Sequence, residues 1–202
     1  MGLFDRYLAL RTRLAGAEPP AHVALVVTER DLLEPDGYET LSAFLDWAVE
    51  YGADRITVYV SVLDREAVDP LCRGLGQIET PRPVTVVGPE EDARGTAPIR
   101  IGVGLGGKHE FTEAVRTLAN AAAAGDLDPS DITETDIEAS LVFPDDPDLI
   151  IKTGAERLSD FMIWQSVYSE LYFTDVNWRD FRKRDYLRAI YDFKTRNRRF
   201  GR

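Results

Sequence analysis

The chain has 202 residues, a formal net charge of -11 and a sequence pI near 4.7. This length suits one α/β domain with a substantial core, and the acidic balance argues against nucleic acid as a general partner, because phosphate backbones are bound by surplus Lys and Arg. A single cysteine, Cys72, excludes an internal disulfide, and no apolar run reaches the ~20 residues that span a bilayer. Without a signal-peptide pattern, we expect a cytoplasmic protein.

Charge is unevenly distributed along the chain. The segment from Arg179 to Arg202 has ten basic and three acidic residues, a local charge of +7, so residues 1 to 178 carry -18. The C-terminus is therefore a cationic element on an acidic body.

The first fifteen residues have the pattern of an amphipathic helix that ends before Gly16 and the Pro19-Pro20 pair. Its apolar side chains could pack on the domain, on a partner chain or on a membrane surface. They are Leu3, Tyr7, Leu8, Leu10 and Leu14. We expect residues 1–20 to form this helix and a linker, and residues 21–202 to form the main domain.

Short apolar runs alternating with helical patterns predict a single α/β domain with a mostly parallel sheet flanked by helices. The expected strands are residues 22–27, 55–62, 84–87, 99–103 and 149–151. The expected helices are residues 38–51, 66–75, 111–124, a short capped helix from Thr133 to Leu141, and 184–196. Apolar residues between Phe161 and Leu171 also recur at helical spacing, which predicts a helix with Glu170 near its end.

The strand at residues 149–151 is followed by an unusual polar stretch. Lys152, Thr153, Arg157 and Ser159 place two cations and two hydroxyls after it, where open α/β sheets bind ligands. The ligand that this set predicts is an anion.

The run DPDLIIKTGAERLSDFMIWQSVYSELYFTDVNW, together with the basic tail from Arg198 to Arg202, resembles the cis-prenyltransferases, the undecaprenyl diphosphate synthase family. The resemblance implies an enzyme fold that condenses isopentenyl diphosphate with an allylic diphosphate, using Mg²⁺, and that dimerises. It also implies that Lys152, Arg157 and Ser159 bind a diphosphate and that Glu170 is a magnesium-associated carboxylate. Arg199 and Gly201 match a tail motif that reaches the partner's diphosphate.

The front of the chain departs from the family pattern. Thr28 occupies the position of the family's catalytic Asp, and Glu29-Arg30-Asp31 replaces its glycine-rich loop. Without glycines the backbone cannot easily bring amides against a diphosphate. Either Glu29 or Asp31 substitutes as the metal ligand, or the segment is a solvated loop. The turn from Gly104 to Glu110, similar to another family element, is either a tight structural turn or a ligand contact.

The C-terminal half keeps the family's motifs, whereas the segment after the first strand, from Thr28 to Asp31, does not. This combination resembles the non-catalytic subunits of heteromeric cis-prenyltransferases. We therefore expect an accessory subunit that gives Arg199 and Gly201 to a catalytic homologue, which holds most of the Mg²⁺, with at most peripheral membrane contact. One alternative is a self-sufficient Mg²⁺-dependent cis-prenyltransferase, active as a dimer with itself. Another is a scaffold that binds polyprenyl phosphate.

Overall fold

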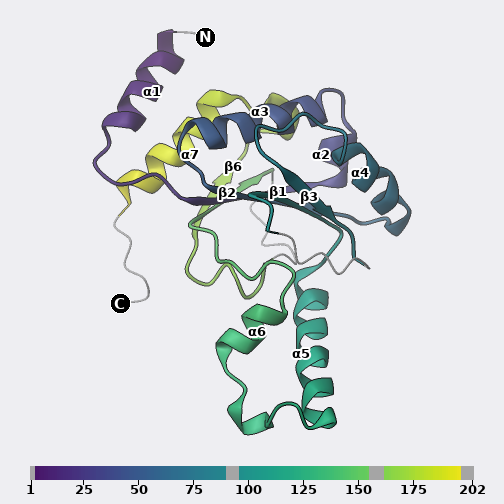
Figure 1. Ribbon diagram of the computed structural model, residues 1–202. Helices are drawn as coiled ribbons and strands as arrows, with labels where there is room; N and C mark the ends of the chain where they lie inside the picture. Colours follow the sequence, from purple (N-terminus) through teal and green to yellow (C-terminus); the bar gives the residue numbers. More distant parts are fainter. Residues whose placement is uncertain (1–2, 90–95, 155–161, 197–202) are drawn as a thin grey trace.

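The computed structural model describes residues 3–89, 96–154 and 162–196. They form one α/β domain around a six-stranded sheet in the order β3-β4-β2-β1-β5-β6, in which every neighbouring pair is parallel (Figure 1). The strands are β1 (His22–Thr28), β2 (Arg55–Ser61), β3 (Val84–Val87), β4 (Ile99–Val103), β5 (Leu149–Thr153) and β6 (Glu170–Thr174). The predicted fold class is confirmed.

The α-helices match most of the predicted ranges. They are α1 (Leu3–Leu14), α2 (Glu29–Leu33), α3 (Gly37–Glu50), α4 (Val68–Leu75), α5 (Gly107–Ala124), α6 (Glu134–Ser140) and α7 (Lys183–Thr195). Short 3₁₀ turns are η1 (Arg65–Ala67), η2 (Pro129–Asp131) and η3 (Trp178–Asp180). The predicted capping box of α6 is present, since both Thr133 N and Thr133 Oγ1 donate to Asp136 Oδ2. No helix in these described stretches is long and apolar enough to cross a bilayer.

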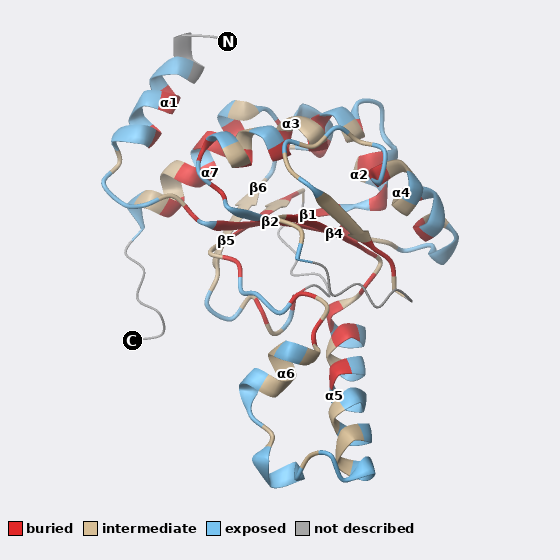
Figure 2. Ribbon diagram, viewed as in Figure 1, coloured by how far each residue is buried: buried red, intermediate tan, exposed pale blue. Residues whose placement is uncertain are grey.

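The main core lies between the sheet and the layer formed by α2, α3, α4 and α7 (Figures 1 and 2). Phe44 of α3 is at its centre, with its ring 5.3 Å from that of Tyr186 and 6.2 Å from that of Trp178. Large rings bury much apolar area and fix the angle at which helices meet the sheet. The central strand β1 is buried from Val23 to Val27, as expected for a parallel strand covered on both faces.

A smaller apolar cluster covers the opposite face of the sheet. Its strand members are Ala24, Val26, Tyr59 and Ile150, which contact residues of the connecting segments, namely Leu105, Phe143 and Met162. Helices α5 and α6 extend away from this face rather than lying along it (Figure 1).

The helix predicted at residues 111–124 is present as α5, but its apolar spacing, which is typical of a helix packed on a sheet, does not describe its surroundings. Only its first turns are buried, at Gly107, Glu110 and Ala114, whereas Val115 is 46% exposed. The apolar side chains that suggested a buried face lie beyond the sheet, where α6 is the neighbouring element. Spacing alone could not distinguish contact with a sheet from contact with one short helix.

The predicted helix ending near Glu170 was also wrong. The chain forms turns over residues 163–168 and then enters β6 at Glu170, which pairs with Leu149 of β5. Each residue of β6 is half-buried, as suits an edge strand. Val167 and Tyr168, which supported the helical pattern, are exposed instead.

Candidate functional site

The carboxyl ends of the parallel strands meet at one edge of the sheet, where ligands bind in open α/β folds. We call this the carboxyl edge, formed by Thr28, Ser61, Val103 and Thr153 with the residues that follow them. The opposite edge, where the strands begin, is called the amino edge.

The rear part of the carboxyl edge is built by β5. Lys152 is half-buried and, by strand alternation, lies on the same face of the sheet as Ile150. Gly154 has a φ of +77°, a left-handed conformation that favours glycine, and an added Cβ would meet nothing within 4 Å. Among the described residues, none would therefore crowd a side chain at Gly154.

The buried hydroxyl of Thr153 lies next to this turn. Its Oγ1 finds no hydrogen-bond partner among the residues that the structure describes. A buried hydroxyl normally has a partner, so this position has capacity for one more polar contact. Arg157 and Ser159, predicted to join Lys152 at the anion site, lie outside the described residues, as do Arg199 and Gly201.

The front part of the carboxyl edge has a different construction. Of the two alternatives for the segment after Thr28, the solvated loop was wrong, because β1 leads directly into α2 with Thr28 as its N-cap. Both the backbone N and the Oγ1 of Thr28 donate to Asp31 Oδ2, each at 2.8 Å, and Asp31 N donates to Thr28 Oγ1 at 3.3 Å. This reciprocal capping box gives both side chains a structural role.

Glu29 is held just as firmly. Its side chain turns towards the segment after β2, where Oε2 accepts hydrogen bonds from Leu63 N at 3.1 Å and Asp64 N at 3.4 Å. The residue is only 8% exposed. A carboxylate of the chain thus binds two backbone amides at the place where a bound anion would require free amides.

The front edge does not fit a magnesium ion in this arrangement. Mg²⁺ needs carboxylate oxygens that are free to face it, usually together with water and substrate phosphate. In each of the two candidate ligands one oxygen is already bonded, Glu29 Oε2 to backbone donors and Asp31 Oδ2 to Thr28. Across residues 3–89, 96–154 and 162–196, no three His, Cys, Asp or Glu side chains group as a metal site.

Glu170 belongs to the amino edge. It begins β6 opposite Leu149, which itself pairs with Val23, so it lies five residues before Thr28 along the strand direction, about 16 Å. Its Oε2 accepts from Arg196 Nη1 at 3.0 Å. Within this chain, Glu170 and Thr28 cannot share one metal ion.

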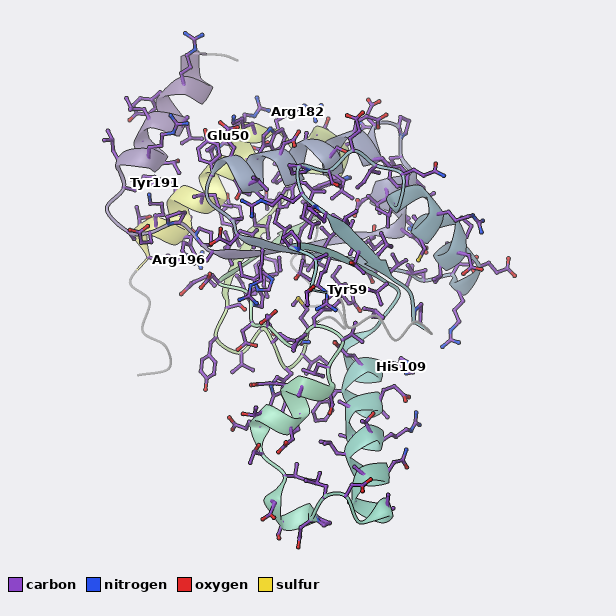
Figure 3. The ribbon with its side chains drawn as sticks, in the orientation of Figure 1. Glu50, Tyr59, His109, Arg182, Tyr191 and Arg196 are labelled. Atoms are coloured by element: carbon purple, nitrogen blue, oxygen red, sulfur yellow. The ribbon has the colours of Figure 1, made fainter. Side chains whose placement is uncertain are left out.

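Arg196 ends the described chain at this amino edge. In addition to Glu170 it donates to the backbone oxygen of Leu171 at 3.1 Å and pairs with Asp192 at 2.6 Å. Figure 3 shows Arg196 and Tyr59 towards opposite ends of the sheet. The described chain therefore ends at the opposite end of the strands from Lys152.

The glycine-rich turn after β4 forms part of the scaffold. Gly104 and Gly106 have φ values of +66° and +62°, and α5 begins directly after them. Three residues later Glu110 is buried, and its Oε1 accepts from Phe143 N at 3.1 Å and Gln165 Nε2 at 3.3 Å. Burial raises the pKa of Glu110 above its usual range.

Sequence reasoning missed this Glu110 network because its members are far apart in the chain. Gln165 Nε2 also donates to Phe143 O at 2.9 Å. The Gln165 side chain therefore links Glu110, in the first turn of α5, to the backbone at Phe143. The sequence signal was a carboxylate in the first turn of an amphipathic helix, which usually faces solvent. The network fixes the segments beneath the sheet, on the face where Lys152 lies.

A cavity of about 430 Å³ lies at the amino edge, at the other end of the strands from Lys152. His22, Thr57 and Arg100 are among its lining residues. The ring of His22 lies between Thr57 Oγ1, 2.9 Å from Nε2, and Asp146 O, 3.1 Å from Nδ1. Burial lowers the pKa of His22.

Comparison with known proteins identifies the fold and the family. The family model described as "Putative undecaprenyl diphosphate synthase" matches residues 88–201. An isoprenyl transferase of Deinococcus radiodurans is 34% identical over 249 aligned positions, covering 98% of this chain and 90% of that protein. The chain belongs to the undecaprenyl diphosphate synthase family.

Other relatives share mainly one part of the chain. A tritrans,polycis-undecaprenyl-diphosphate synthase (geranylgeranyl-diphosphate specific) of Methanopyrus kandleri is 50% identical over 107 residues, 52% of this chain and 40% of that protein. The chain covers about 40% of the length of the first three such archaeal relatives, at 40%, 42% and 39%.

The solved structure of lavandulyl diphosphate synthase from Lavandula x intermedia, in complex with dimethylallyl diphosphate, has the same fold. Its TM-score is 0.73 at 24% identity, with 91% of this chain and 99% of that chain covered. The family model begins at Gly88, after β1 and the loop with Thr28. The alignment of 249 positions with the D. radiodurans relative also exceeds the 202 residues present here, so that relative has segments which this chain lacks.

Proposed function

We propose that this protein is an accessory subunit of a heteromeric cis-prenyltransferase, with little or no prenyl transfer of its own. It pairs with a catalytic homologue that carries an Asp at the position of Thr28 and holds the Mg²⁺. It contributes Arg199 and Gly201 to the diphosphate site of that homologue. Isopentenyl diphosphate and an allylic prenyl diphosphate are the substrates of the assembly.

The observation that carries the proposal is the closed front edge. Thr28 and Asp31 are joined in a capping box, and the Glu29 carboxylate accepts from the amides of the β2 turn. A Mg²⁺-diphosphate would have to displace all of these bonds. The Glu29 bonds are partly buried and cost free energy to break, and the Thr28–Asp31 bonds give both side chains a partner other than the metal. We therefore infer that the chain has no ready site of its own for the metal.

The starting point of the tail supports donation to another chain. Arg196 lies beside Glu170 at the amino edge, whereas Thr174 at the other end of β6 is four residues further, about 13 Å away. Arg199 follows Arg196 by three residues, at most about 11 Å of extended chain. A start at the amino edge is compatible with a target on a neighbouring subunit, and this is the support that we take from it.

The chemistry of the tail suits this role. Arg presents a forked cation that can bind two phosphate oxygens at once, and Gly lets its backbone amide approach an anion closely. At the rear edge, Lys152, Arg157 and Ser159 would bind the diphosphate of isopentenyl diphosphate. Lys152 supplies only a point charge, which is weaker recognition than a forked Arg would give.

A self-sufficient cis-prenyltransferase is the second candidate, favoured by the similarity over 98% of the chain to a protein named isoprenyl transferase. It requires Glu29 or Asp31 to leave its hydrogen bonds and turn towards the metal. Whether Glu29 or Asp31 is the metal ligand, Glu170 of the same chain is at the other end of the strands. Only Glu170 of a second chain could bind the same metal ion.

Affinity purification of the tagged native chain from its own cells tests the pairing. We expect a second cis-prenyltransferase, with Asp where this chain has Thr28, to copurify in a constant ratio. Recovery of this chain alone, with isopentenyl diphosphate incorporated by the purified protein, would support the second candidate instead.

A further inference from the structure

Helix α1 has two unlike faces. One face packs on α7 through Leu8, Ala9 and Thr12, which are all buried. Lys194 of α7 donates to Thr12 O at 2.9 Å, and the Arg11 guanidinium lies 4.3 Å from the centre of the Tyr191 ring. The helix is thus fixed to the domain along one side, next to Tyr191 in Figure 3.

The other face is apolar and exposed. Tyr7, Leu10 and Leu14 are spaced by three and four residues, so they form one line on the helix surface, about opposite the packed face. They are 58%, 58% and 75% exposed. We call this line the α1 stripe. Figure 2 shows α1 largely exposed, at the outside of the molecule.

The charge around the α1 stripe is opposite in sign to that of the whole chain. Helix α1 contains three arginines and one aspartate, a net +2, and α7 contains four basic and two acidic residues, also +2. The whole chain carries -11, so the residues outside these two helices carry a net charge of -15. Arg6 and Arg13 are exposed and lie along one flank of the stripe.

We infer that α1 binds along the surface of a membrane with anionic headgroups, its stripe among the acyl chains and its arginines at the phosphates. An exposed apolar line bordered by arginines is the pattern of helices that lie in the interfacial plane. Anionic lipid complements the cationic end and leaves the acidic remainder of the molecule facing solvent.

A second copy of the chain suits the stripe less well. It would bring the same cationic surface against itself, which opposes contact. Three side chains also fall far short of the ~800 Å² that each partner of a stable protein interface contributes. Weak, reversible lipid contact needs no such area, and this inference does not depend on the accessory-subunit role.

Cosedimentation of the full chain with vesicles tests the inference. We expect binding to phosphatidylcholine vesicles with about one-third phosphatidylglycerol, little binding to pure phosphatidylcholine, and loss of binding in high salt. Leu10→Gln/Leu14→Gln should lower the partition coefficient about tenfold, because two leucines no longer enter the acyl region. Both positions are exposed, so circular dichroism should show an unchanged fold.

Leu63→Gln is the matched control, since Leu63 is 79% exposed in the turn after β2. It should bind vesicles like the unaltered chain. Equal binding by the Leu10→Gln/Leu14→Gln variant, or no binding to anionic vesicles, would overturn the inference. So would sedimentation velocity showing a self-associated chain that dissociates when the two leucines are replaced.

Discussion

The front and rear parts of the carboxyl edge differ although they belong to the same sheet. At the front, Thr28, Glu29 and Asp31 satisfy one another and the nearby backbone amides. At the rear, Gly154 leaves open space and Thr153 has an unused hydroxyl within the described stretches. The comparison teaches that polar residues at the same edge of one sheet can differ in how far the chain itself satisfies their hydrogen bonds.

The largest expected effect concerns the C-terminal tail of this chain in the assembly. Arg199→Ala in the copurified complex should lower isopentenyl diphosphate incorporation about a hundredfold, because one forked cation at a reacting diphosphate is lost. Arg198→Ala is the control from the same tail and should keep full turnover. If both variants are equally active, the tail does not serve the partner's site.

The next effect concerns the closure of the front edge. Glu29→Ala should lower the free energy of unfolding by about 2 kcal/mol, since Leu63 N and Asp64 N lose a charged acceptor. Urea denaturation measures this change. Glu79→Ala, at an exposed position, should have little effect. Equal stability of the two variants would mean that the carboxylate does not hold the β2 turn.

His22, the first residue of β1, should make the free energy of unfolding depend on pH. Burial lowers the pKa of His22, so the unfolded chain gains a proton near pH 6.5 that the folded chain does not bind. Stability from this group is complete above pH 6.5 and falls as the pH drops below it, by up to about 1.4 kcal/mol per pH unit.

Unfolding measured between neutral and mildly acidic pH should show a flatter profile for His22→Asn than for the unaltered chain. His109→Asn, at the other and exposed histidine, is the control and should keep the original slope. An unchanged slope in His22→Asn would show that the buried ring is not the titrating group.

The smallest effect is expected at Thr28, which occupies the position of the family's catalytic Asp. Thr28→Asp should lower the free energy of unfolding by about 1 kcal/mol, because Asp is also a good N-cap but cannot donate to Asp31 Oδ2 and repels that carboxylate. It should give no prenyl transfer, since Glu29 still occupies the amides and the loop glycines are absent. Turnover gained by this single change would contradict the closed-edge account.

Much of the fold could be predicted from the sequence because buried parallel strands are short β-branched runs. The strands β1 to β5 are such runs, although β3 is a mostly half-buried edge strand. In contrast, β6 has no β-branched run and is preceded by aromatic residues that mimic helical spacing. Pattern alone could not show that Val167 and Tyr168 face solvent.

The positions of only some predicted site residues can be compared with the structure. Lys152 and the turn at Gly154 lie at the carboxyl edge, as the position after a buried strand predicts. The amide partners of Glu29 come from a turn more than thirty residues away. Similarly, the position of Glu170 at the amino edge follows from β6, the strand that was missed.

Incorporation of radiolabelled isopentenyl diphosphate into an allylic diphosphate, in the presence of Mg²⁺, tests the central claim most directly. The purified chain alone should give no product above background, and adding the copurified catalytic homologue should give turnover that saturates at a fixed subunit ratio. Sustained Mg²⁺-dependent turnover by the chain alone would contradict the claim that its front edge is closed.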